Sequence, residues 1–283
     1  MSIFDIEIRH AIHPEHAESM ATEELRQHFL VTDLLVPGQP KAVYTHYDRM
    51  VLIGVVPGAE PVALGDDLAA LVKETHFLAR REIGIFNIGG TGSVSADGKS
   101  YTLGHMDALY LPMGTKSVSF ASADAGKPAM FYANSAPAHA AHPVVHMQAA
   151  AIQGDTLGAQ ETANLRVLTK YMHPAAFPTC QLVMGRTVLQ PGNVWNTLPP
   201  HTHDRRMETY LYHDLKDGQA VFHFMGRPEA TRHLVIRNLE AVISPPWSIH
   251  SGSGTSSYAF IWSMAGDNQA FTDMDMIPVA NLA

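Results

Sequence analysis

The chain has 283 residues, 46% hydrophobic and 16% charged, an ordinary balance for one large or two small globular domains. Its formal net charge of −8 argues against nucleic acids and polyanionic polymers as main partners, although a local basic pocket could still bind a small anion. The single cysteine excludes an intramolecular disulfide and fits a reducing cytoplasm. We expect neither a signal peptide nor a segment that crosses a membrane.

Residues 1–40 are predicted to form an N-terminal arm with one helix. Ser19 or Thr22 could cap this helix, and Leu25 and Phe29 would lie on its apolar side.

Residues 41–140 contain short segments rich in β-branched residues, which predict strands. Asp66 to Val72 could form a short helix. Asp97-Gly98 is a strong signal for a tight hairpin. The glycine cluster at 89–92 is not followed by a helical pattern, so it predicts a turn and not a phosphate-binding loop.

The same pattern returns later in the chain. Residues 80–85 parallel 205–210, and residues 107–112 parallel 240–245, which predicts two copies of one β-barrel unit. Many short strands with Gly and Pro turns and few helices favour an antiparallel barrel or a jelly roll. We place a connector at 141–160, because it is rich in Ala, Pro and Gly, and the second copy at 161–283.

A potential metal site lies in the second copy. His201 and His203 are two residues apart, so on a strand their imidazoles would share one face. Glu208 cannot share that face on a straight strand, but the polar run at 204–206 could bend the chain and bring it in on the adjacent strand. His250 would come from a third strand. Three imidazoles and one carboxylate suit a divalent transition metal such as zinc, iron, manganese or nickel.

The first copy lacks these residues. Phe77 and Ala79 occupy the stretch that would carry the His-x-His pair, and Ser117 falls where His250 would fall. We therefore expect residues 41–140 to be structural or to line an interface.

The spacing of Gly192, His201, His203, Glu208 and Gly218, followed by Pro245 and His250, resembles the two motifs of the cupin superfamily. More particular phrases surround these motifs: Trp195-Asn196-Thr197, Arg205-Arg206-Met207-Glu208 and residues 244–252, together with residues 80–90 and 273–275. Over nearly its whole length the chain thereby resembles the 4-deoxy-L-threo-5-hexosulose-uronate ketol-isomerases of pectin breakdown.

The resemblance implies an all-β fold of two cupin-like (jelly-roll) β-barrels in tandem with a few short helices. It implies a cytoplasmic, hexameric, metal-dependent isomerase, with Zn²⁺ held by His201, His203, Glu208 and His250. The reaction would convert 5-dehydro-4-deoxy-D-glucuronate, a small ketouronate, to 3-deoxy-D-glycero-2,5-hexodiulosonate. It moves a carbonyl from C1 to C2, which a Lewis-acidic metal would assist, either with a base that transfers the proton or by a metal-assisted hydride shift.

Other interpretations remain open at the level of the sequence. Four protein ligands could form a closed site in which the metal only stabilises the barrel. The same ligands could serve an Fe(II) cupin dioxygenase, a non-enzymatic sugar-binding cupin, or a 5-deoxyglucuronate isomerase.

The sequence does not identify the base. Lys170, Tyr210 and Arg206 are weak candidates for catalytic residues, and Arg206 could point outward from an adjacent strand position. A substrate carboxylate would need a cation, for which Arg166, Lys170, Arg186 and Arg206 are comparable candidates.

Overall fold

A computed structural model describes residues 3–267 and 273–283 of the chain. Its secondary structure is mostly β, which confirms the predicted all-β class. The chain divides into two compact units, each built from separate segments. The first unit comprises residues 1–9, 33–153 and 171–183, and the second comprises residues 10–32, 154–170 and 184–283.

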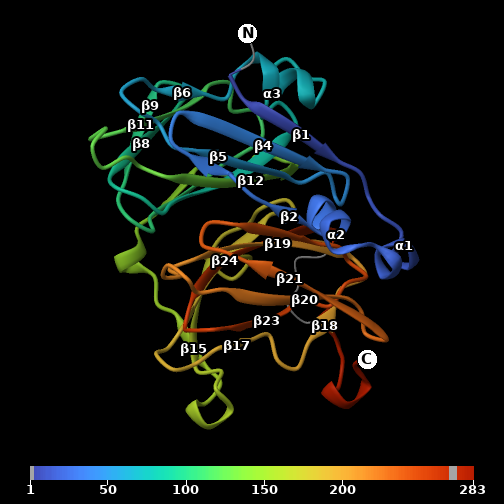
Figure 1. Cartoon of the computed structure of the whole chain (residues 1–283). Helices are drawn as coiled ribbons and strands as arrows, with labels where there is room; N and C mark the ends of the chain where they lie inside the picture. Colours follow the sequence, from blue (N-terminus) through green and yellow to red (C-terminus); the bar gives the residue numbers. More distant parts are fainter. Residues whose placement is uncertain (1–2, 268–272) are drawn as a thin grey trace. The chain divides into compact units, whose positions relative to one another are not determined.

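The first unit contains a long, largely antiparallel sheet (Figure 1). Its strands in the described residues are β1 (Asp5–Arg9), β3 (Leu35–Val36), β4 (Gln39–Thr45), β5 (Val51–Val55), β7 (Arg81–Asn87), β10 (Ala108–Leu111), β12 (Phe131–Pro137) and β13 (Val145–Met147). They are connected in the order β1-β4-β5-β12-β7-β10-β13, with β3 paired to β4. Only the β1–β4 pair in this path is parallel.

A smaller sheet of the first unit has the order β6-β11-β8-β9. Its strands are β6 (Val62–Ala63), β8 (Gly92–Ala96), β9 (Lys99–Leu103) and β11 (Val118–Ser122). Side chains of both sheets meet in one hydrophobic cluster, which includes Ile83 of β7 and Phe120 of β11, both fully buried. Asp97 and Gly98 both have positive φ angles, 48° and 81°, between β8 and β9, which confirms the predicted hairpin.

The second unit repeats this plan (Figure 1). Its long sheet has the order β14-β15-β16-β24-β19-β22-β2 and its smaller sheet the order β17-β23-β20-β21. The strands are β2 (Leu30–Val31), β14 (Asp155–Leu157), β15 (Arg166–Met172), β16 (Val183–Leu189), β17 (Trp195–Asn196), β19 (Arg206–His213), β20 (Val221–Arg227), β21 (Ala230–Ile236), β22 (Ala241–Ser244), β23 (Ser251–Gly254) and β24 (Ala259–Gly266). A two-stranded ladder joins β18 (His201–Thr202) to β25 (Asp275–Met276).

The two units share their strand order. Matched along the chain, β4, β5, β7, β10 and β12 occupy the same sheet positions as β15, β16, β19, β22 and β24. The smaller sheets match in the same way. The hydrogen bonds among the described residues do not close these sheets into barrels, so the tandem barrels stay a prediction.

Helices are short and few in the described part of the chain. They are α1 (Pro14–Ser19), α2 (Thr22–Phe29) and α3 (Asp66–Leu71), with 3₁₀ turns at Ala149–Ala151, Gln160–Thr162 and Val279–Asn281. The helix predicted at Asp66 is confirmed. None of these helices has the length and apolar character needed to cross a membrane.

The N-terminal arm differs from the prediction of one capped helix. It contributes strand β1 to the first unit and both α1 and α2 to the second. Neither Ser19 nor Thr22 caps α2, because Ser19 ends α1 and Thr22 is already helical. The cap position is Ala21, whose side chain has no oxygen to accept a hydrogen bond.

Candidate metal centre and cavity

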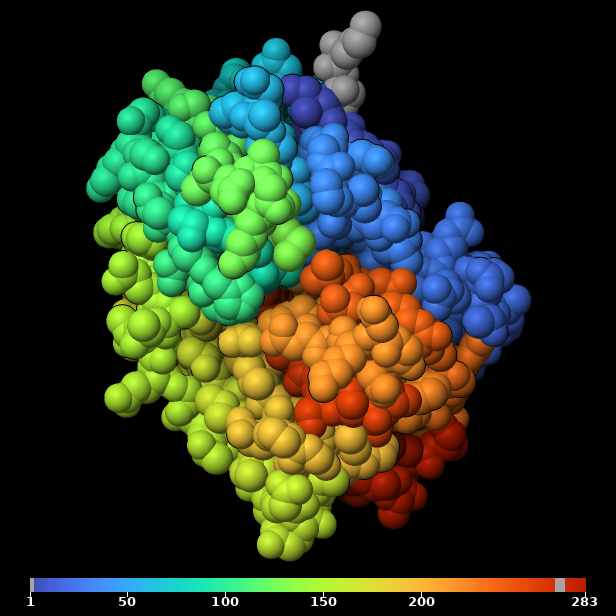
Figure 2. Space-filling view, turned by 60° about the vertical axis from the view of Figure 1, so that its left-hand side comes forward, coloured from blue at the N-terminus to red at the C-terminus, as the bar shows by residue number. Residues whose placement is uncertain are grey.

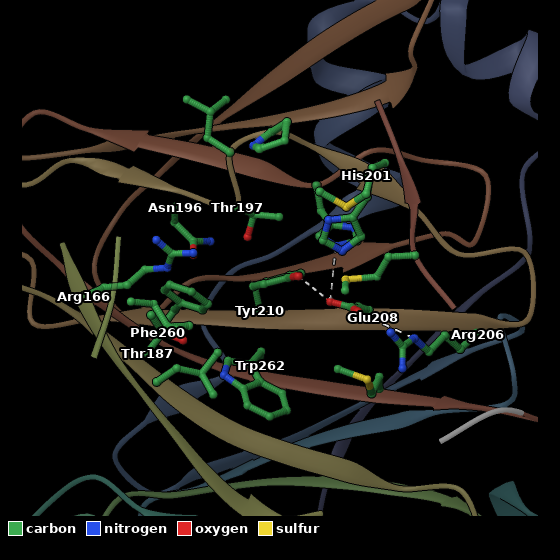
Figure 3. Close-up of a pocket in the computed structure, with 18 residues that line it drawn as sticks. Arg166, Thr187, Asn196, Thr197, His201, Arg206, Glu208, Tyr210, Phe260 and Trp262 are labelled. Carbon is green, nitrogen blue, oxygen red and sulfur yellow. Dashed lines mark hydrogen bonds and ion pairs between the residues drawn. The ribbon is translucent and has the colours of Figure 1, made fainter. Parts of the chain in front are cut away.

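A cavity of about 280 Å³ lies within the second unit (Figure 3). Alternate residues of β24, Phe260, Trp262 and Met264, line one wall, as expected for side chains that share one face of a strand. Met274 and Met276 add further apolar surface. The polar lining residues are Arg166, Thr187, Asn196, Thr197, His201, Arg206, Glu208, Tyr210 and His250.

The four predicted metal ligands come together beside this cavity, and His201, Glu208 and His250 also line it. One donor nitrogen from each of His201, His203 and His250 lies within 4.8 Å of the others. Nε2 of His250 is 2.9 Å from Nε2 of His201. Oε1 of Glu208 is 2.9 Å from Nε2 of His203, and its Oε2 is 3.6 Å from Nε2 of His250. Three imidazole nitrogens and one carboxylate therefore point toward one small volume.

Local structure explains this convergence, with one difference from the strand argument. Strand β18 ends at Thr202, so His203 lies just beyond the strand that carries His201. The backbone N–H of His203 donates to the carbonyl of Pro246 (3.2 Å), near the segment that carries His250. A turn at residues 204–205 then leads into β19, which carries Glu208, as the polar run predicted.

The electrostatics favour a cation between these groups. Burial lowers the pKa of His201 to about 4 and the pKa of His250 well below its usual value, so both rings are neutral near pH 7. Burial alone would raise the pKa of Glu208, but His250, His203 and Arg206 together hold it well below its ordinary value. Neutral imidazoles and an ionised carboxylate are the protonation states that bind a divalent metal.

A buried ion pair orients one of the histidines. Nη2 of Arg206 lies 2.8 Å from Oδ1 of Asp273 and 3.1 Å from Nδ1 of His203. The same carboxylate oxygen of Asp273 is 3.6 Å from that Nδ1. Arg206 is only 1% exposed, so the expectation that it could point outward is wrong. Because Arg206, Glu208 and Tyr210 alternate along β19, they share the face that lines the cavity.

Tyr210 is directly bonded to the candidate ligand set. Its hydroxyl donates to Oε2 of Glu208, and its side chain lines the cavity. Burial and the negative charge of Glu208 raise the pKa of Tyr210 well above its ordinary value, so it keeps its proton at neutral pH. Behind it, the hydroxyl of Tyr212 lies 2.7 Å from Nδ1 of His223. Burial lowers the pKa of His223 to about 3.

The remaining basic residues divide into those inside and outside the cavity. Arg166 lines the cavity wall from β15. Lys170, on the same strand, is not part of that wall, and its ammonium pairs with Asp155 at 3.1 Å, where both side chains are exposed. Arg186 pairs with Asp214 at 3.0 Å and is also outside the lining.

Sequence reasoning did not single out Asp273 as part of the site. It appeared only within the residues 273–275 that contributed to the family resemblance. No spacing rule links it to His203, because it returns to the site 70 residues later in the chain. The alternation along β19 could have placed Arg206 inward, since Arg206 and Glu208 are two residues apart.

A family model described as the KduI/IolB family matches residues 37–278 of the chain. Proteins named 4-deoxy-L-threo-5-hexosulose-uronate ketol-isomerase, from Salmonella paratyphi A and Escherichia coli O157:H7, are 47% identical over 277 residues. Each of these matches covers 98% of this chain and 100% of the relative.

Solved structures with little sequence identity show the fold. An IolB-like protein from Salmonella typhimurium LT2 superposes with a TM-score of 0.69 at 14% identity, covering 88% of this chain and 96% of that one. Lactobacillus farciminis oxalate decarboxylase gives a TM-score of 0.55 at 10% identity, over 80% of this chain and 79% of that one. These neighbours support the predicted cupin-like fold.

Proposed function

The chain belongs to the KduI/IolB family, and we propose that it is a ketol-isomerase, as its relatives are named, and that its activity depends on a metal. Its substrate would be 5-dehydro-4-deoxy-D-glucuronate and its product 3-deoxy-D-glycero-2,5-hexodiulosonate, a step in pectin breakdown. The observation that carries this proposal is the convergence of His201, His203, Glu208 and His250 beside a cavity of about 280 Å³.

The donor set fits one divalent cation, and we propose Zn²⁺. Nε2 of His203 faces Oε1 of Glu208 at 2.9 Å, and Nε2 of His201 and of His250 face each other at the same distance. Three nitrogens and one carboxylate oxygen match the ligand types that zinc prefers. When bound, the cation would supply Lewis acidity that makes the carbon next to the substrate carbonyl more acidic.

Side chains of the protein would bind the substrate and donate a proton to it. Of the three candidate catalytic residues, Lys170 pairs with Asp155 outside the cavity and Arg206 is occupied by Asp273. Tyr210 lines the cavity and keeps its proton at neutral pH. We therefore assign Tyr210 the role of a donor whose single O–H proton turns from Oε2 of Glu208 to the substrate oxygen on which negative charge develops. The apolar wall of Phe260, Trp262 and Met264 would exclude water from that step.

The finer organisation belongs to the same proposal. Residues 161–283 would form the metal-binding barrel, and residues 41–140 a barrel without ligands, preceded by the arm at 1–40 and followed by the connector at 141–160. We propose a homohexamer in the cytoplasm that acts on a small ketouronate.

A substrate panel tests the reaction. The purified, metal-loaded chain is incubated with 5-dehydro-4-deoxy-D-glucuronate, and the products are identified by NMR. The proposal expects the 2,5-diketo acid to form without oxygen consumption and expects slower conversion of 5-deoxyglucuronate. Preferred conversion of 5-deoxyglucuronate, or oxygen uptake with an iron-loaded chain, would replace the proposed reaction with a different one.

A further inference from the structure

The cavity has a polar region formed by other residues than the candidate metal ligands. Arg166 of β15, Thr187 of β16, Asn196 of β17 and the following Thr197 contribute to the lining. In Figure 3 these four labelled side chains lie on one side of the view, and Glu208 and Arg206 lie on the other. The cavity is therefore lined by two polar groups, with Tyr210 drawn between them (Figure 3).

Arg166 carries the positive charge in this second polar group. Its hydrogen bond within the described residues runs from Nη1 to the backbone carbonyl of Asn164 (2.9 Å), a neutral acceptor. No carboxylate in the described ranges 3–267 and 273–283 forms an ion pair with it. A guanidinium has five N–H groups, so Arg166 can still donate to a ligand.

The other basic groups of the cavity do not offer a comparable charge. Arg206 is paired with Asp273 at 2.8 Å. His201 and His250 belong to the candidate metal ligands, and their Nε2 atoms face each other at 2.9 Å. A partly buried guanidinium without an anionic partner is unfavourable, and a ligand anion would relieve that cost. The cavity thus has a site for an anion away from the candidate metal ligands.

We propose that Arg166 binds the terminal carboxylate of the substrate and thereby directs the carbonyl end toward the histidines. This inference rests on the proposed function, because it assigns the orientation of a ketouronate. Strands β15 and β19 are separated by β16 and β24, which is three strand spacings, or roughly 14 Å along the sheet. The long side chain of Arg166 covers part of that separation, and an open six-carbon acid can cover the rest.

Kinetics with an acid and its neutral counterpart test this assignment. The substrates are the ketouronate and its C6 amide, and the variants of the metal-loaded full chain are Arg166→Gln and Arg166→Lys. The matched control is Arg237→Gln, which removes one positive charge from an exposed loop of the same unit. Thermal unfolding of each variant establishes that it is folded.

Arg166→Gln is expected to raise KM for the acid about 10- to 100-fold, the effect of losing a hydrogen bond between charged groups. Its kcat/KM for the amide should stay within about threefold of the wild type, because the amide has no charge to lose. Arg166→Lys should keep part of the preference for the acid, since it keeps the charge but not the planar donor pair. Arg237→Gln should leave both substrates unaffected.

Two results overturn the inference. Equal losses for acid and amide would give Arg166 a structural role, and an unchanged KM for the acid would exclude it from binding. If the wild type converts neither compound, the proposed function fails. Calorimetry with galactarate, an open-chain dicarboxylate without an aldehyde, then still decides whether Arg166 binds a carboxylate. At least tenfold weaker binding to Arg166→Gln supports the assignment, and equal binding rejects it.

Discussion

The first and second units have the same strand order, but different kinds of side chains fill their interiors. Ile83 of β7 pairs with Leu111 and Ser135, and Glu208 of β19 pairs with Ser244 and Met264 on the corresponding strands. Ile83 is thus the first unit's counterpart of Glu208, and it is fully buried in the hydrophobic cluster. At the position where the second unit has a candidate metal ligand, the first unit has a residue of its hydrophobic core.

This comparison bears on whether a metal is needed for the fold. The first unit has the same sheet order, and no group of three ligand residues was found in it among the described residues. Phe77, which stands in the stretch of the His-x-His pair, is 2% exposed and belongs to its core. The same strand order therefore forms in the first unit around a hydrophobic core, without such a group of ligand residues. This weighs against a metal that only stabilises the second unit.

A buried arginine precedes each of these positions by two residues. In the first unit Arg81 donates to the hydroxyl of Ser135 (3.1 Å) and to the carbonyl of Arg49 (2.6 Å). Burial lowers its pKa to about 10, and the positive charge of Arg49 contributes to the shift. In the second unit Arg206 instead pairs with Asp273 beside His203. The same residue type links loops and strands in one unit and orients a candidate ligand in the other.

Removing a ligand should have the largest effect on activity. His250→Ala is expected to lose the bound metal and to lower kcat/KM by about 10³-fold or more, because Lewis acidity contributes several kcal/mol. Its counterpart by position, Ser117→Ala in the first unit, should leave both quantities unchanged. Metal analysis and kinetics on the same samples check this pair. A metal-free His250→Ala protein with normal turnover would contradict the comparison.

Tyr210→Phe should have the next largest effect, a loss of about 100-fold in kcat with metal content unchanged, since it removes a proton donor and not a ligand. The first unit offers a matched Tyr–Glu pair, in which the hydroxyl of Tyr110 donates to Glu82 at 2.7 Å. Tyr110→Phe should reduce stability by about 1 kcal/mol and leave kcat unchanged. If Tyr210→Phe and Tyr110→Phe lower kcat equally, Tyr210 has no specific catalytic role.

Asp273→Asn should produce a smaller change, because Asp273 acts through His203. We expect metal affinity to fall about 10- to 100-fold, the usual effect of changing the residues behind a ligating histidine, because the amide loses the charge that pairs with Arg206 beside His203. Competition with a chelator measures that affinity. Asp275→Asn, which changes an exposed residue of β25, is the control and should match the wild type. If the metal affinity of Asp273→Asn is unchanged, the ion pair between Asp273 and Arg206 has only a structural role.

Phe77→Ala should have the smallest effect on turnover and a large one on stability. Truncating this buried ring is expected to cost about 3–5 kcal/mol of unfolding free energy. Urea unfolding measures that cost, and kcat per folded molecule should remain that of the wild type. A specific loss of kcat in a folded Phe77→Ala protein would mean that the first unit takes part in catalysis.

The sequence predicted the strands and the His201–His203 pair because their signals are local, whereas the resemblance to the family motifs completed the ligand set with Glu208 and His250. Alternation, turn residues and the spacing of His201 and His203 act within a few residues of one another. The position of Asp273 and the inner orientation of Arg206 depend on which strands meet, and local periodicity does not encode that. The cap of α2 is a similar case. Thr22 is a residue type favoured at an N-cap, but the helix already begins at Thr22, and the sequence does not encode this shift of one residue.

In the space-filling view the segment that carries β14 lies at the surface of the second unit (Figure 2). Its Leu157 is 38% exposed and also contributes to the cavity lining. The cavity wall therefore includes a residue from an exposed edge strand, a position that no hydrophobic pattern in the sequence singled out.

A metal titration of the folded, metal-free chain tests the central proposal most directly. Circular dichroism first establishes that the chelator-treated protein keeps its fold. Zn²⁺ is then added in small steps while ketouronate turnover is followed. We expect no turnover without metal and a linear rise that ends at one metal per chain. Full turnover in the metal-free protein, or one bound metal per chain without any turnover, would contradict the assignment of His201, His203, Glu208 and His250 to a catalytic metal.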